Sequence, residues 1–358
     1  MEKRSILKEN DMNQPRERNA QPIKIIVWNV LLGGCLMLSL PGHAGITFQF
    51  EYADAPDTGF FDPVFGAIRQ NALNTAANAF SDMFGSHFNN SGTILLKTYS
   101  SNDRDNTLAS STSYFYAGGK GFGANGVKEV IIDKLITGHD YNGSHPDGEL
   151  HINFGHTWEL DFNQPAIPAF GWYSGTRDFY GTLFHEFTHA LGFNSTILQS
   201  GAPLAEAPSW SRFDSFIVDK NDIPIIDHDT FELNQAAWDV SSVGNWGGGG
   251  TEGLFFGGPV TMAANNDSSV TLYTFDEWSS GSSVAHLDGR IIGRDGMMMT
   301  PSAPAGPLAR DYSDIEVAML TDLGYSVAVV PEPETWSMML AGLALLGSVV
   351  RRSTRREV

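Results

Sequence analysis

The sequence predicts an α+β fold in which two lobes enclose a cleft. Strand-like and helical segments fill the first part of the globular region, and a strongly apolar helix follows over residues 176–193. A long stretch rich in Gly, Ser, Asn and Asp then leads to a final helix over 313–325. The chain has 358 residues, of which 42% are hydrophobic, so it can bury a sizeable core.

The first lobe is expected to hold a sheet and one long helix. Alternation of apolar and polar residues predicts strands over 46–52, 93–100 and 149–155. Apolar residues at a spacing near 3.6 predict a helix over 63–84. Residues 127–136 fit a helix or a strand, and the polar residues 101–113 are expected to form a loop.

The second lobe has fewer regular elements. Residues 215–219 predict a short strand. The final helix carries clear end signals, because Ser313 and Glu316 have the spacing of a capping box and Gly324 follows as a stop.

The N-terminus resembles a secretory signal. The apolar run 25–40 follows Lys24 and ends in small residues, which predicts a signal peptide over 1–44 that is cleaved after Ala44. A retained membrane helix and a lipoprotein box at Cys35 are the alternatives. Because Cys35 is the single cysteine, the mature chain is expected to have no disulfides.

The C-terminus combines three features. Pro331-Glu332-Pro333 precedes an apolar run from Trp336 to Val350, and four arginines follow it: Arg351, Arg352, Arg355 and Arg356. Physically this is a short membrane segment with a cationic stop. The tail, residues 331–358, resembles the PEP-CTERM sorting signal of Gram-negative bacteria. That resemblance implies transient inner-membrane association, processing by an exosortase, and a final place in the cell envelope or outside the cell. A plain C-terminal anchor is the alternative.

The charge pattern excludes one class of partner. The formal net charge is −19, and the acidic excess lies between the two ends, in the expected globular domain 45–330. Such a surface repels nucleic acid. The Asp- and Asn-rich segments 102–106 and 219–229 are candidate calcium (Ca2+) sites, although neither has EF-hand spacing.

The segment FHEFTHALGF, residues 184–193, carries the chemistry. His185 and His189 are four residues apart and share one helix face, so both can bind one zinc ion (Zn2+). Glu186 lies beside them, where it can take a proton from zinc-bound water and pass it to the leaving amine. The alternative, two core histidines satisfied without metal, requires other partners for buried polar groups.

A catalytic zinc needs a third protein ligand. Ser195 stands where the compact metzincin pattern has its third histidine, so the ligand must come from elsewhere. His286 is the leading candidate, because Met299 follows it in a Met-Thr-Pro sequence. The carboxylates of Glu206 and Asp214 are the alternatives, as in thermolysin-type sites.

The H-E-x-x-H-x-x-G-F motif, the distant histidine, the methionine turn and a helix ending in DLGY resemble leishmanolysin-like metzincins over residues 175–325. The resemblance implies a zincin-type, metzincin-like fold. It assigns His185, His189 and His286 as the zinc ligands, Glu186 as the base and Met299 as the methionine beneath the metal. Leishmanolysin-type proteins are rich in cysteine and this chain is not, so no substrate preference carries over.

The functional hypothesis is an exported zinc-dependent endopeptidase acting on a protein or peptide substrate. Two alternatives are a non-catalytic zincin-fold binding protein of the envelope or matrix, and a zinc hydrolase of a non-peptide amide. Tyr312 is a candidate oxyanion donor, and the strand 149–155 is a candidate partner for an extended substrate. His151 and His156 are expected to be structural.

Overall fold

The computed structural model describes residues 45–170, 175–205, 208–243, 253–274, 277–289, 297–328 and 341–346. The chain divides into two compact units, Met1–Gly42 and His43–Val358, and all described residues belong to the second. Below, the sheet half means residues 45–205 and the loop half means residues 208–328.

The sheet half is built on four strands in the order β1-β2-β7-β3. Their bounds are Ile46–Tyr52 for β1, Gly92–Ser101 for β2, Gly148–Asn153 for β7 and Ala109–Ser113 for β3. β1, β2 and β7 run parallel, and β3 pairs antiparallel with β7 at the edge of the sheet. The three strands expected from alternation are confirmed.

The expectation that 101–113 is a loop is wrong, because its second part forms β3. This strand consists of Ala109 followed by serines and a threonine. Most of its side chains are at least partly exposed. An edge strand exposed in this way needs no apolar alternation, so the pattern that reveals buried strands is missing.

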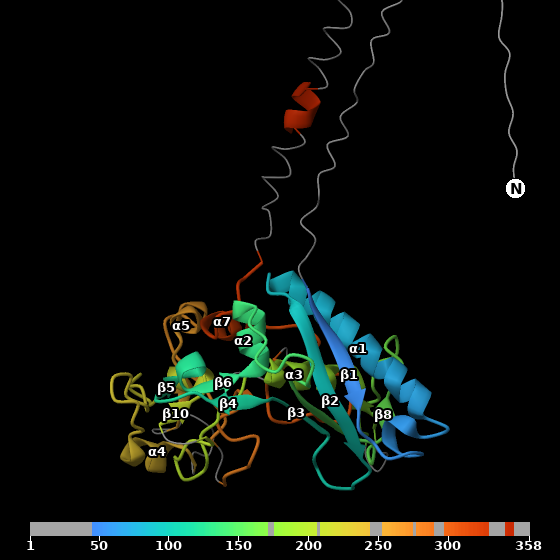
Figure 1. Ribbon diagram of the computed structural model, residues 1–358, viewed down its shortest axis with the longest axis horizontal. Coiled ribbons are helices and arrows are strands. Elements are labelled where there is room, and N and C mark those ends of the chain that lie inside the picture. Colours follow the sequence, from blue (N-terminus) through green and yellow to red (C-terminus); the bar gives the residue numbers. More distant parts are fainter. Residues whose placement is uncertain are drawn as a thin grey trace, which may run out of the picture. The chain divides into compact units, whose positions relative to one another are not determined.

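Two helices pack on one face of this sheet. Helix α1 spans Gly66–His87 and helix α3 spans Phe179–Ala190, close to the predicted ranges. Phe48 of β1 stacks on Phe187 of α3 with ring centroids 4.4 Å apart, and Phe80 of α1 lies 5.3 Å from the same ring. In Figure 1, α1 runs beside β1, and α3 lies between these strands and the helices α4 and α5. Three aromatic rings therefore hold the candidate site helix against the sheet.

Residues 127–136, which fitted either element, contain both. Strand β6 spans Val127–Glu129, and helix α2 follows directly over Val130–Thr137. The other short elements of this half are β4 at Phe115–Ala117, which pairs with β6, β5 at Gly121–Phe122, β8 at Trp158–Glu159 and β9 at Arg177–Asp178, with 3-10 turns at Gly59–Phe61 and Gly123–Asn125.

The loop half has short elements between long turns. They are β10 at Ser209–Trp210, a 3-10 turn at Phe213–Phe216, β11 at Ile217–Val218, α4 at Gln235–Ser241, β12 at Phe255–Phe256, α5 at Pro259–Ala264, β13 at Val270–Thr271 and α7 at Asp314–Asp322. The predicted capping box at the start of α7 is confirmed, and Gly324 follows with φ 107. The short strand expected within 215–219 is β11.

The structure describes little of the two sorting segments. The expected signal peptide over 1–44, with Cys35, lies outside the described residues, as does the tail apart from a helical stretch over 341–346. Among the described helices, none combines the length and the apolar character that a membrane crossing requires.

Candidate metal centre

Helix α3 begins at a buried carboxylate. Asp178 caps it by accepting hydrogen bonds from the backbone N–H groups of Tyr180 and Gly181, both at 3.1 Å. Arg310, from the chain just before α7, pairs with the same carboxylate at 2.9 Å. An N-cap with a bound guanidinium fixes where the helix starts, and hence where its histidines point.

The end of α3 also serves the site. Gly192 has φ 91, a left-handed conformation that glycine adopts without strain, and its N–H bonds to the His189 carbonyl at 3.0 Å. The turn brings the Phe193 carbonyl back to Nδ1 of His189 at 2.7 Å. The glycine in the motif therefore ends the helix and orients its second histidine.

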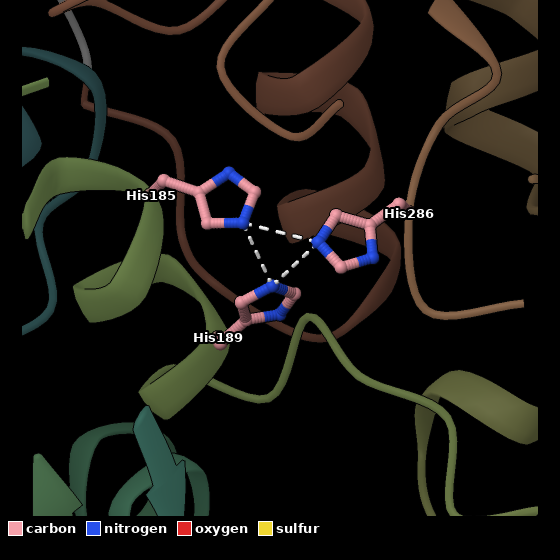
Figure 2. A group of neighbouring side chains, drawn as sticks. All are labelled: His185, His189 and His286. Atoms are coloured by element: carbon pink, nitrogen blue, oxygen red, sulfur yellow. Dashed lines mark hydrogen bonds between the residues drawn. The ribbon is translucent and has the colours of Figure 1, made fainter. Parts of the chain in front are cut away.

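Three histidine rings converge beyond this helix. His185 and His189 project from α3, and His286 reaches them from the segment after β13 (Figure 2). The Nε2 atoms of His185 and His189 lie 3.0 Å apart. Nε2 of His286 lies 3.1 Å from that of His185 and 3.0 Å from that of His189. The structure thus brings the three predicted ligands together across 101 residues of sequence.

Each ring is held from behind by a backbone carbonyl. Nδ1 of His185 faces the Met298 carbonyl at 2.8 Å, and Nδ1 of His286 faces the Ser282 carbonyl at 3.0 Å. A carbonyl only accepts, so each Nδ1 carries the proton and each neutral ring directs its Nε2 lone pair at the other two rings. Three converging lone pairs cannot satisfy one another, whereas a cation at their centre accepts all three.

The electrostatic environment favours neutral rings. Burial lowers the pKa of His185, brings the pKa of His189 to about 3, and holds the pKa of His286 well below its usual range. Neutral imidazole is the form that binds metal. Four tetrahedral ligands at the zinc–nitrogen distance lie roughly 3.3–3.4 Å apart, close to the observed spacing. Within the described ranges, these three residues are the one group whose ligand atoms converge in this way.

Glu186 lies on the same helix, next to the first histidine. Its side chain is 6% exposed, and burial raises its pKa to about 8. The backbone N–H of Ser111, in the edge strand β3, donates a hydrogen bond to it and partly offsets that rise. A carboxyl with a pKa near neutrality can both accept and return a proton, which suits a general base that later acts as an acid.

The alternative carboxylate ligands do not join the histidines. Asp214 is fully buried, and its oxygens accept hydrogen bonds from Ser195, Thr196 and Ser211. It therefore ties the turn after α3 to the start of the loop half. Glu206, the other alternative, lies outside the described residues.

Met298 and Met299 have different surroundings, which the sequence did not show. Met299, the predicted methionine beneath the metal, is fully buried, but its side-chain role stays a prediction. Met298, the residue before it, contacts both His185 and the site helix. Its carbonyl orients His185, and its sulfur lies 3.5 Å from the Thr188 hydroxyl. No side-chain pattern could reveal the contact with His185, because the backbone carbonyl of Met298 makes it.

Two weaker candidates are placed elsewhere. The Tyr312 hydroxyl is buried and already bonds to the Thr188 hydroxyl at 2.9 Å, so its oxyanion role stays a prediction. The strand within 149–155 pairs on both sides, with β2 and with β3, so it has no free edge for a substrate. The sheet edge next to β7 belongs to β3, whose range falls in the segment expected to be a loop.

The remaining candidates have ordinary structural surroundings. His151 stacks on Tyr99 with centroids 5.1 Å apart, and His156 lies against Trp158. In the segments proposed for calcium, Asp105 bonds to the Asn153 amide, and Asp219 and Asp227 accept hydrogen bonds from N–H groups of their own turns. Calcium binding there stays a prediction.

Comparison with known proteins identifies the tail. A model of the PEP-CTERM protein-sorting motif matches residues 329–356, which confirms the interpretation of the C-terminus. The chain is therefore an exported protein of the Gram-negative cell envelope pathway, with a tail recognised by an exosortase. No curated protein matches the chain.

Proposed function

We propose that this chain is an exported zinc-dependent endopeptidase with a zincin-type, metzincin-like fold. The observation that carries the proposal is the convergence of three neutral histidine Nε2 atoms beside Glu186. Three protein ligands with a fourth position left open are typical of catalytic rather than structural zinc sites. When bound, zinc supplies a Lewis acid that polarises a carbonyl and lowers the pKa of water.

The residues of the chain then have distinct tasks. His185, His189 and His286 hold the ion, and backbone carbonyls fix their rings. Glu186 receives the proton of the attacking water on its carboxylate and returns it to the leaving amine. Its buried place beside the first ligand, against the edge strand, supports this role.

The edge strand favours a peptide substrate over a small amide. Leu108 and Tyr114, which flank β3, bond to the neighbouring chain around β7, so the alternate residues Ala109 and Ser111 direct their backbone groups away from the sheet. Ser111 also reaches Glu186, which brings this edge beside the base. An extended peptide that adds to such an edge gains main-chain hydrogen bonds.

A non-catalytic binding protein with the same fold is the second candidate. The retained pair of features, a buried Glu186 beside three converging histidines, argues against it, because binding alone needs no base. The sorting tail fits both candidates, since it says where the protein goes and not what it does there.

The test is hydrolysis of an unstructured protein such as casein by the purified full chain. Cleavage should stop when a chelator removes the metal and return when zinc is added back. Glu186→Gln should lose about 10²- to 10⁴-fold in rate while retaining its zinc. Glu51→Gln, an exposed carboxyl-to-amide change on the sheet, is the matched control and should cleave normally.

Two results would contradict the proposal. Unchanged cleavage by Glu186→Gln would show that another group acts as the base. A wild-type chain that holds zinc but cleaves no protein would favour the binding protein.

A further inference from the structure

One peptide unit connects a buried carboxylate to the metal centre. The carbonyl of the Met298–Met299 peptide accepts the Nδ1 proton of His185 at 2.8 Å. The N–H of the same peptide, on Met299, donates to Glu316 Oε1 at 2.7 Å. The peptide is therefore held at both ends, by a ligand on one side and by an acid from α7 on the other.

Glu316 is built into this position. It is fully buried, and its second oxygen accepts hydrogen bonds from the Ser313 N–H at 2.8 Å and the Ser313 hydroxyl at 2.7 Å. The Met298 N–H is a further donor to the carboxyl. Burial raises the pKa of Glu316, and the surrounding N–H groups oppose that rise. Since the partners of its oxygens donate, the acceptor-only carboxylate is the form that matches the site.

The capping box does not explain the whole arrangement. A capping box requires only the reciprocal bonds between Ser313 and Glu316, which occupy Oε2. The bond from Oε1 to Met299 is additional, and it reaches the segment that orients His185.

We propose that Glu316 is a positioning residue for the metal centre, acting through the Met298–Met299 peptide on His185. A carboxylate that accepts a hydrogen bond from the N–H of a peptide group polarises that group and increases the negative charge on its carbonyl oxygen. The stronger acceptor holds Nδ1–H more firmly and raises the electron density at Nε2. The arrangement acts as a carboxylate–histidine–metal triad with one peptide inserted between acid and imidazole.

His286 offers an internal comparison. Its carbonyl partner belongs to the Ser282–Ser283 peptide, whose N–H bonds at 2.8 Å to the neutral carbonyl of Ser279. The peptide behind His286 thus ends on a neutral turn, whereas the peptide behind His185 ends on a carboxylate. The two ligands should differ in how strongly the residues behind them influence metal binding.

The inference rests on the proposed function only in its metal-binding part, so the test measures metal affinity without any substrate. Zinc affinity of the purified full chain is measured by competition with a chromophoric chelator, and the visible spectrum of bound Co2+ reports ligand geometry. Glu316→Gln should weaken zinc binding by about 10- to 100-fold and change the Co2+ spectrum.

The matched control is Asp322→Asn in the same helix. Asp322 accepts three hydrogen bonds from α5, from the Val260 N–H at 3.0 Å and from the N–H and hydroxyl of Thr261 at 2.9 Å and 2.7 Å. The substitution makes the same acid-to-amide change and should lower the melting temperature while leaving zinc affinity within about twofold. A second variant, Glu316→Asp, keeps the charge but retracts the carboxylate, and should lose less affinity than Glu316→Gln.

The outcomes distinguish the positioning role of Glu316 from the proposed function. If the wild type binds zinc and both Glu316→Gln and Glu316→Asp bind it with unchanged affinity, the positioning role is overturned and the proposed function stands. Equal losses in Glu316→Gln and Asp322→Asn reduce Glu316 to a structural role, which also overturns the inference. A wild-type chain that binds no zinc overturns the proposed function itself. If Glu316→Gln does not fold, the comparison of Glu316→Asp with Asp322→Asn decides.

Discussion

His185 and His189 come from the sheet half, whereas His286 comes from the loop half, and the two halves are organised by different means. In the sheet half the ligands share one helix, which aromatic rings clamp to the sheet and Asp178 caps. In the loop half regular structure is short, and buried carboxylates bind backbone and hydroxyl groups instead. Asp214 and Glu316 are both fully buried in this way.

The comparison teaches that a metal ligand does not require a regular element behind it. A helix places ligands through its periodicity, and a carboxylate with several N–H donors can fix a turn with similar precision. The helix leaves a trace in the sequence, because its spacing is local. The carboxylate leaves little trace, because its donors are backbone groups far away along the chain.

The largest expected effect concerns the ligands of the two halves. If the loop half is as well fixed as the helix, His286→Ala should lower zinc affinity as much as His189→Ala. Both losses should exceed the roughly 10- to 100-fold typical of residues behind a ligand, since a bond to the metal itself is removed. Chelator competition measures both variants, with the exposed His228→Ala as the control. A much smaller loss for His286 than for His189 would show that the loop half is not part of the site.

The next effect tests the carboxylates that replace secondary structure. Asp214→Ala leaves the donors of Thr196 and Ser211, which are buried, and of Ser195, which is partly buried, without their acceptor. Each unsatisfied donor costs about 1–3 kcal/mol, so the free energy of unfolding should fall by several kcal/mol. Urea denaturation measures the change against the exposed Asp229→Ala. Similar stabilities for the two variants would mean that Asp214 does not organise this region.

A third prediction concerns pH and the junction between the halves. Burial and the charge of Asp214 raise the pKa of Glu129 to about 8, above the value of about 4.3 for an unfolded chain. The folded state then binds the proton more tightly, so its contribution to stability is complete below the lower pKa and is lost as pH rises towards 8. One pKa unit corresponds to about 1.4 kcal/mol, so the loss by pH 8 should be a few kcal/mol.

Glu129→Gln checks this dependence, because the amide does not titrate. Unfolding free energy measured by urea between pH 5 and 8 should fall less steeply in the variant than in the wild type. Parallel curves for the two proteins would show that Glu129 keeps an ordinary pKa in the folded state.

The smallest effect separates packing from catalysis. Tyr312→Phe removes the hydrogen bond to Thr188 and should cost about 1 kcal/mol of unfolding free energy. Peptide hydrolysis should change little, since the hydroxyl is buried and bonded to Thr188. An oxyanion donor would instead cost about 10²- to 10³-fold in kcat, so a loss of that size would restore the role first considered for Tyr312.

The accuracy of the sequence predictions depends on whether an element leaves a local pattern in the sequence. Strands β1, β2 and β7 and helices α1, α3 and α7 follow from local periodicity and end signals, and their observed ranges lie close to the predicted ones. Strand β3 escaped prediction because its serines and threonine do not alternate with apolar residues. Its importance comes from its place at the edge of the sheet, which is a tertiary property.

The candidate site shows the same limit. His185, Glu186 and His189 are recognisable from their spacing alone. The convergence of His286 with them depends on the loop half, and its prediction needed the resemblance as well as the residues. The carbonyls of Met298, Phe193 and Ser282 left no signal, because any residue type supplies a carbonyl. Glu316 was visible as a capping residue, but its bond to Met299 was not.

The central claim is that one zinc ion is held by three imidazoles drawn from both halves. Zinc-edge X-ray absorption of the zinc-loaded full chain counts these ligands directly. The account predicts three imidazole nitrogens at about 2.0–2.1 Å, completed by water oxygen. Two imidazoles with a protein carboxylate, which would point to Glu206, would contradict it, as would a chain that retains no zinc.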